Sequence, residues 1–283
     1  MNEPLVSVVI PTYNSEKTLA MCLGSVRNQT YKNIEVIAVD SFSKDQTIRI
    51  AESFDVRVIQ TNWKLLGARY LGFRESVGDV IILLDSDQVL ESTAIERSVK
   101  LLNDGYDMLC LEEHSLEPKG LLLKMFEADR KLLHKFAEVH LDPVEGVLLA
   151  RVYKREILDV VFEKIPNALY PFVVAHDHAI IYYEAYKVSQ KVSIVPNATW
   201  HIEPRSLWDF IKKNYTYGKS AYPLAKSGYY RDLLKKKIRF RKCASKDWRL
   251  GFQTYLLLAL KGACYYAGYF STKIKQLLNM GLK

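Results

Sequence analysis

The sequence is poor in cysteine, and the few cysteines it has are not arranged to bind zinc or to form a disulfide framework. Four cysteines are scattered over 283 residues, and no two of them are spaced as C-x-x-C. This spacing excludes a zinc knuckle, and the low number excludes a small fold held together by disulfides. We therefore expect a protein of a reducing compartment.

The sequence also shows no internal repeats, no low-complexity tracts and no pattern typical of a secretory leader. The first residues lack the basic and apolar regions of a signal peptide, because a strand pattern already begins at Leu5. We expect this part of the chain to lie in the cytoplasm.

The composition is that of a globular protein with one large domain, or one domain plus an appendage. Hydrophobic residues make up 49% of the chain and charged residues 25%. Lys and Arg number 40 against 32 Asp and Glu, a formal net charge of +8. Such an excess favours an anionic partner: nucleic acid, an anionic membrane or a phosphorylated ligand.

Strand and helix patterns alternate through the first 85 residues. Buried strands are predicted over 6–10 (ended by Pro11), 34–40, 56–60 and 80–84, and helices over 14–29, 43–54 and 67–76. This alternation predicts an α/β fold with a doubly wound, mostly parallel sheet flanked by helices. Later segments predict helices at 94–104, 120–139 and 175–187, strands at 108–115 and 192–196, and a strand running into a helix over 146–161.

Polar residues follow the predicted strands at their carboxyl ends, where ligands bind in such sheets. Asp85, Ser86 and Asp87 follow the fourth strand. Paired carboxylates suit Mn²⁺ or Mg²⁺, which also bridge diphosphate oxygens; the alternative is two solvated loop residues. Asp40 ends the second strand and could bind a base or ribose, or cap the next helix.

Two further segments lie near these ends. Thr12 and Tyr13 follow the first strand, and Tyr13 could border a base or belong to the core. Gly67 and Arg69 open the third helix, where a helix N-terminus and a guanidinium suit a diphosphate; a surface salt bridge is the alternative.

The segments "VSVVIPTYN", "VIAVDSFSKDQT", "GARYLG" and "GDVIILLDSD" occur in an order and at a spacing that resemble family 2 glycosyltransferases of the GT-A fold. The resemblance is strong over residues 5–90 and weak to about 220. It implies a nucleotide site, and a metal on the diphosphate of a nucleotide sugar held by Asp85 and Asp87, with Asp87 the direct ligand. The implied nucleotide-site residues are Pro11, Tyr13, Glu16, Asp40 and Arg69. Ser41 and Tyr70 depart from the family pattern.

The resemblance also suggests a catalytic base. Inverting members usually supply it from an acidic pair that opens a helix, and the best match is "AHDHAII", so Asp177 is the candidate. A helix cap is the alternative role. His201, in "TWHIEP", could complete the metal shell or be structural. Arg205, Lys213, Tyr217 and Lys219 follow and could bind phosphates.

The composition changes near residue 229. Residues 231–242 hold seven basic residues and one acid, and 250–270 hold one charge, Lys261. The basic segment could bind nucleic acid, be a solvated face, or lie on an anionic bilayer. The apolar segment could be a buried helix or a membrane span, but Thr254, Lys261, Tyr265 and Thr272 share one stripe. We favour amphipathic helices in one leaflet, packed back on the enzyme.

These expectations combine into one hypothesis. Residues 1–228 form the catalytic domain, with a nucleotide half to about 90 and an acceptor half beyond, and 229–283 attach it peripherally to the cytoplasmic face of the membrane. It is predicted to move a sugar from a GDP- or UDP-linked donor, with GDP-mannose preferred, to a hydroxyl of a lipid-linked acceptor, without nucleic acid. The alternatives are a polyprenyl phosphate glycosyl synthase, a nucleotidyltransferase and a non-catalytic adaptor.

Overall fold

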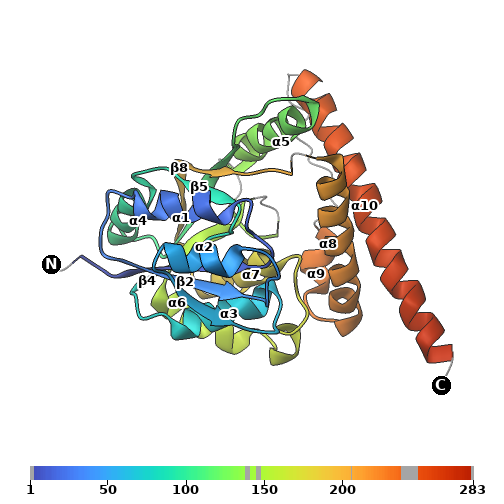
Figure 1. The fold of residues 1–283 in the computed structure, drawn as a ribbon, viewed down its shortest axis with the longest axis horizontal. Helices are drawn as coiled ribbons and strands as arrows, with labels where there is room; N and C mark the ends of the chain where they lie inside the picture. Colours follow the sequence, from blue (N-terminus) through green and yellow to red (C-terminus); the bar gives the residue numbers. More distant parts are fainter. Residues whose placement is uncertain (1–2, 138–140, 145–147, 205, 237–247, 282–283) are drawn as a thin grey trace.

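A single sheet organises the fold, with helices packed on both of its faces (Figure 1). The computed structural model describes residues 3–137, 141–144, 148–204, 206–236 and 248–281. The strands are β1 (Val6–Thr12), β2 (Ile34–Asp40), β3 (Arg57–Gln60), β4 (Val80–Leu83), β5 (Gln88–Leu90), β6 (Met108–Ser115), β7 (Ala150–Lys154) and β8 (Val192–His201). The helices are α1 (Leu19–Arg27), α2 (Thr47–Ser53), α3 (Leu65–Glu75), α4 (Ala94–Asn103), α5 (Leu121–Ala137), α6 (Arg155–Lys164), the 3₁₀ turn η1 (Asn167–Leu169), α7 (Asp177–Val188), α8 (Leu207–Ser227), α9 (Arg231–Lys236) and α10 (Trp248–Gly281).

The strand order in the described sheet is β3-β2-β1-β4-β7-β6-β8-β5. The first four strands in this order are parallel, as expected for the nucleotide half. Beyond β4 the sheet is mixed: β7 runs antiparallel to both of its neighbours, β6 and β8 are parallel, and β5 is antiparallel to β8. The predicted α/β class is confirmed, and the predicted mostly parallel sheet is confirmed only for its first half.

The C-terminal helices form a layer at one end of the molecule (Figure 1). Helices α8 and α10 lie side by side, and α5 packs on the first half of α10. Lys261 points to α5, with its Nζ 3.8 Å from Asp129 Oδ2 and 4.5 Å from the centre of the Phe126 ring. Thr254 is buried. The predicted stripe therefore faces the rest of the protein. The described chain includes no helix with both the length and the apolarity to cross a membrane.

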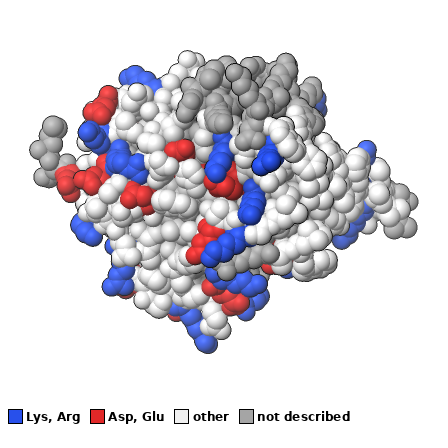
Figure 2. Space-filling model, turned by 90° about the horizontal axis from the view of Figure 1, so that it is seen from above, with Lys and Arg blue, Asp and Glu red and all other residues white. Residues whose placement is uncertain are grey.

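Charge is distributed unevenly between this layer and the rest of the surface. In Figure 2 the end of the molecule formed by the C-terminal helices shows blue and white surface, whereas red side chains gather elsewhere on this face. Residues 206–283 contain 17 Lys and Arg but only three Asp and no Glu. The first 205 residues contain 23 basic and 29 acidic residues. The positive excess of the chain therefore belongs to its C-terminal part.

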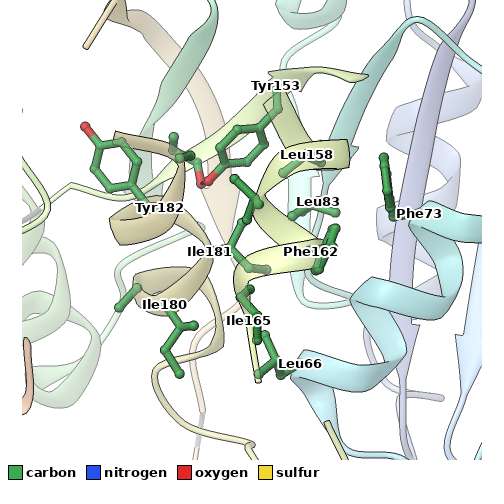
Figure 3. Packing of buried hydrophobic residues seen from close by; sticks show 14 of the residues in the cluster. Leu66, Phe73, Leu83, Tyr153, Leu158, Phe162, Ile165, Ile180, Ile181 and Tyr182 are labelled. Atoms are coloured by element: carbon green, nitrogen blue, oxygen red, sulfur yellow. Dashed lines mark hydrogen bonds between the residues drawn. The ribbon is translucent and has the colours of Figure 1, made fainter. Parts of the chain in front are cut away.

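Two hydrophobic layers cover the faces of the sheet because strand side chains alternate between them. Val9 points to the layer formed with α3, α6 and α7, and Val8 and Ile10 point to the layer formed with α1, α2 and α4. Figure 3 shows the first layer, in which Phe73 of α3 and Phe162 of α6 lie with ring centroids 5.0 Å apart. Burial on both faces explains the continuous apolar runs that made these strands visible in the sequence.

Most predicted elements are confirmed within a few residues, and the differences have local causes. β1 continues through Pro11 to Thr12. The pairing of β1 with β4 already ends at Val9. The missing N–H of Pro11 would point to that side of β1, so no hydrogen bond between strands is lost. α1 begins only at Leu19, because Ser15 is held by other contacts. β5 was not predicted, and β8 extends to His201 because it pairs with β5.

The two C-terminal segments behave differently from each other. The apolar segment 250–270 lies within α10, one helix of 34 residues. The basic segment is described only as α9, where Leu233 is buried. The remainder of that segment, 237–242, lies outside the described residues, as does Arg205.

Candidate active site

Two loops at the carboxyl ends of β1 and β2 are joined by hydrogen bonds. Asn14 N–H donates to Ser43 Oγ (2.8 Å), and the N–H of Gln46 donates to Glu16 Oε2 (3.1 Å). Both side chains at 14 and 16 are exposed. The loops form one rim beside the exit of β4, since Ser15 Oγ lies 2.9 Å from Ser86 Oγ.

Asp40 lies beneath this rim and is buried. Its carboxylate accepts hydrogen bonds from Thr12 Oγ1 (2.9 Å) and from the Ser43 backbone N–H (2.8 Å). It therefore shapes the loop instead of capping α2, whose first N–H, that of Thr47, donates to Asp45 Oδ1. Tyr13 is 62% exposed, which removes the core alternative and leaves its ring open to a ligand.

Gly67 and Pro11 are buried in the walls of this region. A Cβ on Gly67 would lie 2.6 Å from both Trp63 Cβ and the Tyr170 carbonyl oxygen, so glycine lets α3 pack closely. The N–H of Leu66, in the first turn of α3, donates to Val173 O (3.1 Å). What α3 contributes to the site directly is therefore Arg69.

Arg69 is fully buried and connects the two halves of the sequence. Its Nε lies 2.6 Å from Asp177 Oδ2, and its Nη2 pairs with Asp85 Oδ1. The alternative considered from the sequence, a surface salt bridge, is therefore wrong. Arg69 is buried and forms ion pairs with two carboxylates. Its Nη1 is buried and has no hydrogen-bond partner among the described residues.

Asp85 receives a second guanidinium that sequence reasoning did not identify. Arg151 of β7 places Nη1 2.7 Å from Asp85 Oδ2 and also contacts His178 Nε2. Its Nη2 lies 3.4 Å from Glu113 Oε1, and Glu113 pairs with Arg130. Arg151 lies within a strand and belongs to no recognisable motif, so its role could not be predicted from the sequence. Only the pairing of β4 with β7 brings it to Asp85.

Asp87 has a different set of partners, from α8 and β8. Lys213 Nζ lies 2.9 Å from Oδ2, and His201 Nε2 lies 3.4 Å from Oδ1. On the other side of its ring, His201 Nδ1 is 3.5 Å from Glu203 Oε2, and Glu203 pairs with Arg130. The structure thus brings together the predicted Asp87, His201 and Lys213.

Asp87 and His201 fit a divalent cation better than Asp85 does. An octahedral ion with bonds of about 2.1 Å places neighbouring ligand atoms about 3 Å apart, close to the separation of the two side chains. His201 Nδ1 makes no hydrogen bond to Glu203 or to any other described residue, and its Nε2 is the ring nitrogen that faces Asp87. Asp85 instead meets two guanidinium groups. The described residues contain no cluster of three His, Cys, Asp or Glu side chains arranged for a metal. A metal held by Asp87 and His201 would take its further ligands from a diphosphate or water.

Charge pairing keeps the acids of the site ionised. Burial by itself raises the pKa of Asp177, but Arg69 lowers it below the usual aspartate value. For Asp85, Arg151 and Arg69 outweigh burial and hold its pKa well below the usual range. Burial, together with Arg151 and Arg69, lowers the pKa of His178 to about 4. At neutral pH the site therefore has ionised carboxylates and a neutral His178.

Comparison with known proteins matches part of the sequence to one family. Residues 7–118 match the family model described as "Glycosyl transferase family 2". A protein named "Uncharacterized glycosyltransferase" of Haemophilus influenzae is 36% identical over 140 residues, 47% of this chain and 56% of that protein. The GalNAc(5)-diNAcBac-PP-undecaprenol beta-1,3-glucosyltransferase of Campylobacter jejuni is 30% identical over 147 residues, 48% of this chain and 46% of that protein. The chain spans about half the length of these relatives.

Solved structures share the fold over a larger part of the chain. Staphylococcus aureus TarS 1–349 in complex with UDP has a TM-score of 0.55 at 17% identity, covering 97% of this chain and 92% of that one. Glucosyl-3-phosphoglycerate synthase of Mycobacterium tuberculosis, in complex with Mn²⁺, UDP and glucosyl-3-phosphoglycerate, has a TM-score of 0.54 at 18% identity and covers 79% of each chain. Residues 7–118 therefore resemble the catalytic domain of family 2 glycosyltransferases, and the similarities support a glycosyltransferase enzyme.

Proposed function

We propose that the chain is an inverting, metal-dependent glycosyltransferase that moves a sugar from a nucleotide sugar to a hydroxyl group of a lipid-linked acceptor. The observation that carries the proposal is the buried Arg69, which joins Asp85 at the exit of β4 to Asp177 at the start of α7. Asp85 is expected to lie next to the donor diphosphate, and Asp177 is the expected base. Because Arg69 contacts both, the two carboxylates are close enough to take part in one transfer reaction.

A uridine nucleotide is the donor that the relatives favour. TarS 1–349 was solved with UDP and with UDP-GlcNAc, and the mycobacterial synthase with UDP. None of these names supports the GDP-mannose expected from the sequence, which remains a prediction. The Campylobacter relative is named for a diphosphate-linked undecaprenol acceptor. This name supports a lipid-linked acceptor for the present chain.

In the proposed reaction the residues of the chain position the donor and remove one proton. Asp177 accepts the proton of the acceptor hydroxyl, and that oxygen attacks the anomeric carbon from the face opposite the nucleoside diphosphate. Asp177 Oδ2 faces Arg69, and within the described residues no hydrogen bond engages Oδ1. Oδ1 is therefore the oxygen available to the acceptor. Asp40 and Tyr13 border the nucleoside.

The metal would be held by Asp87 and His201. A bound Mn²⁺ or Mg²⁺ would neutralise the charge that develops on the leaving diphosphate. Lys213, which contacts Asp87, offers a second positive charge in the same place. The manganese in the mycobacterial neighbour supports a divalent cation here.

Replacing Asp87 by alanine tests donor binding directly. In the wild type, Mn²⁺ is expected to tighten binding of one UDP-sugar relative to EDTA, measured by calorimetry with UDP-glucose, UDP-GlcNAc and GDP-mannose. In the variant this gain is expected to vanish, because the carboxylate that shares the ion with the diphosphate is gone. Asp104→Ala, at an exposed acid of the other half, should keep the full gain.

Either of two results would contradict this prediction. An unchanged gain in the Asp87→Ala variant would place the metal elsewhere. No binding of any nucleotide sugar, with or without metal, would contradict the transferase itself.

We also propose that α10 attaches the protein to the cytoplasmic face of an anionic membrane. Large apolar side chains are exposed along its whole length. They include Trp248, Phe252, Leu256, Leu260, Phe270, Ile274 and Leu278. They follow one another every four residues, apart from the ten between Leu260 and Phe270, and this spacing puts them on one face. The basic excess of residues 206–283 suits anionic lipid headgroups.

Charge on this face should prevent lipid binding. Phe252→Glu and Phe270→Glu are expected to lower co-sedimentation with phosphatidylglycerol-containing vesicles at least severalfold, because a carboxylate resists insertion into the interface. Val77→Glu changes a residue that is 73% exposed on the catalytic half and should have no effect. Equal loss in all three variants, or in none, would exclude α10 as the contact.

A further inference from the structure

Helices α8 and α10 approach each other so closely that their backbones touch. A Cβ on Gly218 of α8 would lie 1.8 Å from the Tyr265 carbonyl oxygen, and a Cβ on Gly268 of α10 would lie 2.1 Å from the Tyr215 carbonyl oxygen. Any residue other than glycine would separate the helices at these points. Tyr215 Oη also lies 2.7 Å from Ser271 Oγ. The relative position of α8 and α10 is therefore well determined.

Side chains beside this crossing hold the two residues that precede Asp177. The N–H of Ala175 donates to Ser220 Oγ of α8 (3.1 Å), and Ser220 Oγ donates in turn to Tyr217 O (3.0 Å). His176 Nε2 lies 3.3 Å from Tyr265 Oη of α10. Burial raises the pKa of Tyr265 to about 12, so its hydroxyl keeps its proton at neutral pH.

His176 has a backbone conformation that needs such support. Its φ is +72° and its ψ is 8°, in the left-handed region that residues with a Cβ seldom occupy. His176 is also the N-cap of α7 and gives no side-chain cap to it. The segment just before Asp177 is therefore held by contacts from other helices and not by its own local preferences.

We infer that Ser220 and Tyr265 are positioning residues for Asp177, and that the C-terminal helices thereby complete the active site. The inference rests on the proposed role of Asp177 as the base. Asp177 is the first residue of α7, so a change at Ala175 or His176 rotates its carboxylate relative to Arg69 and to an acceptor. A misplacement of about 1 Å at a reacting group can slow a reaction about 100-fold.

The test removes single hydroxyl groups. Tyr265→Phe and Ser220→Ala are compared with Tyr266→Phe, which changes the neighbouring tyrosine, 43% exposed on the same helix. UDP release from UDP-glucose and UDP-GlcNAc is measured with water as the acceptor. We expect kcat to fall about 10- to 100-fold in the first two variants, with the KM for the donor unchanged. The acid limb of the pH profile should move to higher pH, because Asp177 loses part of its contact with Arg69.

A second measurement needs no substrate. Hydrogen exchange of the segment 173–180 should become faster in Tyr265→Phe and Ser220→Ala but not in Tyr266→Phe. Wild-type kcat and exchange in Tyr265→Phe, or equal changes in Tyr266→Phe, would overturn the inference and leave the proposed function intact. Full activity of Asp177→Asn would instead overturn the proposed function.

Discussion

Asp177→Asn is expected to lower sugar transfer to a hydroxyl acceptor by about 10²- to 10⁴-fold, the usual contribution of a general base. The amide keeps the size of the side chain and can still accept from Arg69 Nε, but it cannot take the acceptor proton. Binding of the nucleotide sugar should be nearly unchanged, because Asp177 is expected to face the acceptor. The measurements are initial rates and calorimetric donor affinity on the same preparation.

A control variant and an alternative acceptor show whether a loss of activity is due to the missing base. Asp159→Asn, at an exposed position of α6, should have wild-type rates. A phosphate acceptor is already ionised and needs no base, so substantial activity in Asp177→Asn would favour transfer to polyprenyl phosphate over transfer to a hydroxyl. Loss of donor binding together with activity would show that the change disturbs the whole site.

Arg69→Met should have the largest effect on stability. Arg69 is fully buried and stands between Asp85 and Asp177. Methionine leaves the buried Asp177 and the part-buried Asp85 with less positive charge, and breaking a buried pair from one side costs about 3–5 kcal/mol of unfolding free energy. The unfolding free energy of Arg69→Lys should lie between those of the wild type and Arg69→Met, because one ammonium cannot reproduce the fork of two N–H groups. Chemical denaturation monitored by circular dichroism measures the loss.

An exposed ion pair supplies the matched comparison. Arg57 pairs with Glu75 at the surface, with 57% of its side chain exposed, so Arg57→Met should change stability by less than about 1 kcal/mol. If Arg69→Met and Arg57→Met lost similar stability, the buried bridge would be unimportant for the fold. Adding Asp177→Asn to Arg69→Met should recover part of the loss, since one unpaired charge is then removed.

The first four strands of the sheet could be predicted from the sequence alone. β1 and β4 are buried on both faces, so mostly apolar runs that end at Pro11 and Asp85 marked them without any knowledge of their partners. Predicted strands such as 34–40 and 108–115 agree with β2 and β6 residue for residue. The carboxyl ends of parallel strands lie at one edge, so the clustering of the loops there also followed from local patterns.

The partners of these carboxylates, in contrast, could not be predicted without the folded structure. Arg69 reaches Asp177 across 108 residues, and Lys213 reaches Asp87 across 126. Arg151 belongs to β7, which β4 pairs with in an antiparallel register that no local spacing indicates. Ion pairs between distant residues depend on strand order and helix packing, and neither leaves a period in the sequence.

The C-terminal helices illustrate the same division. The sequence showed the apolar segment, its one internal lysine and the stripe that faces the enzyme. It did not show that Gly218 and Gly268 let α8 and α10 touch, or that Tyr265 reaches His176. In the sequence, a glycine inside a helix is only a weak helix former. The reason for its missing side chain becomes clear only when a second backbone lies against it. The contact that gives these glycines their meaning exists only in the folded chain.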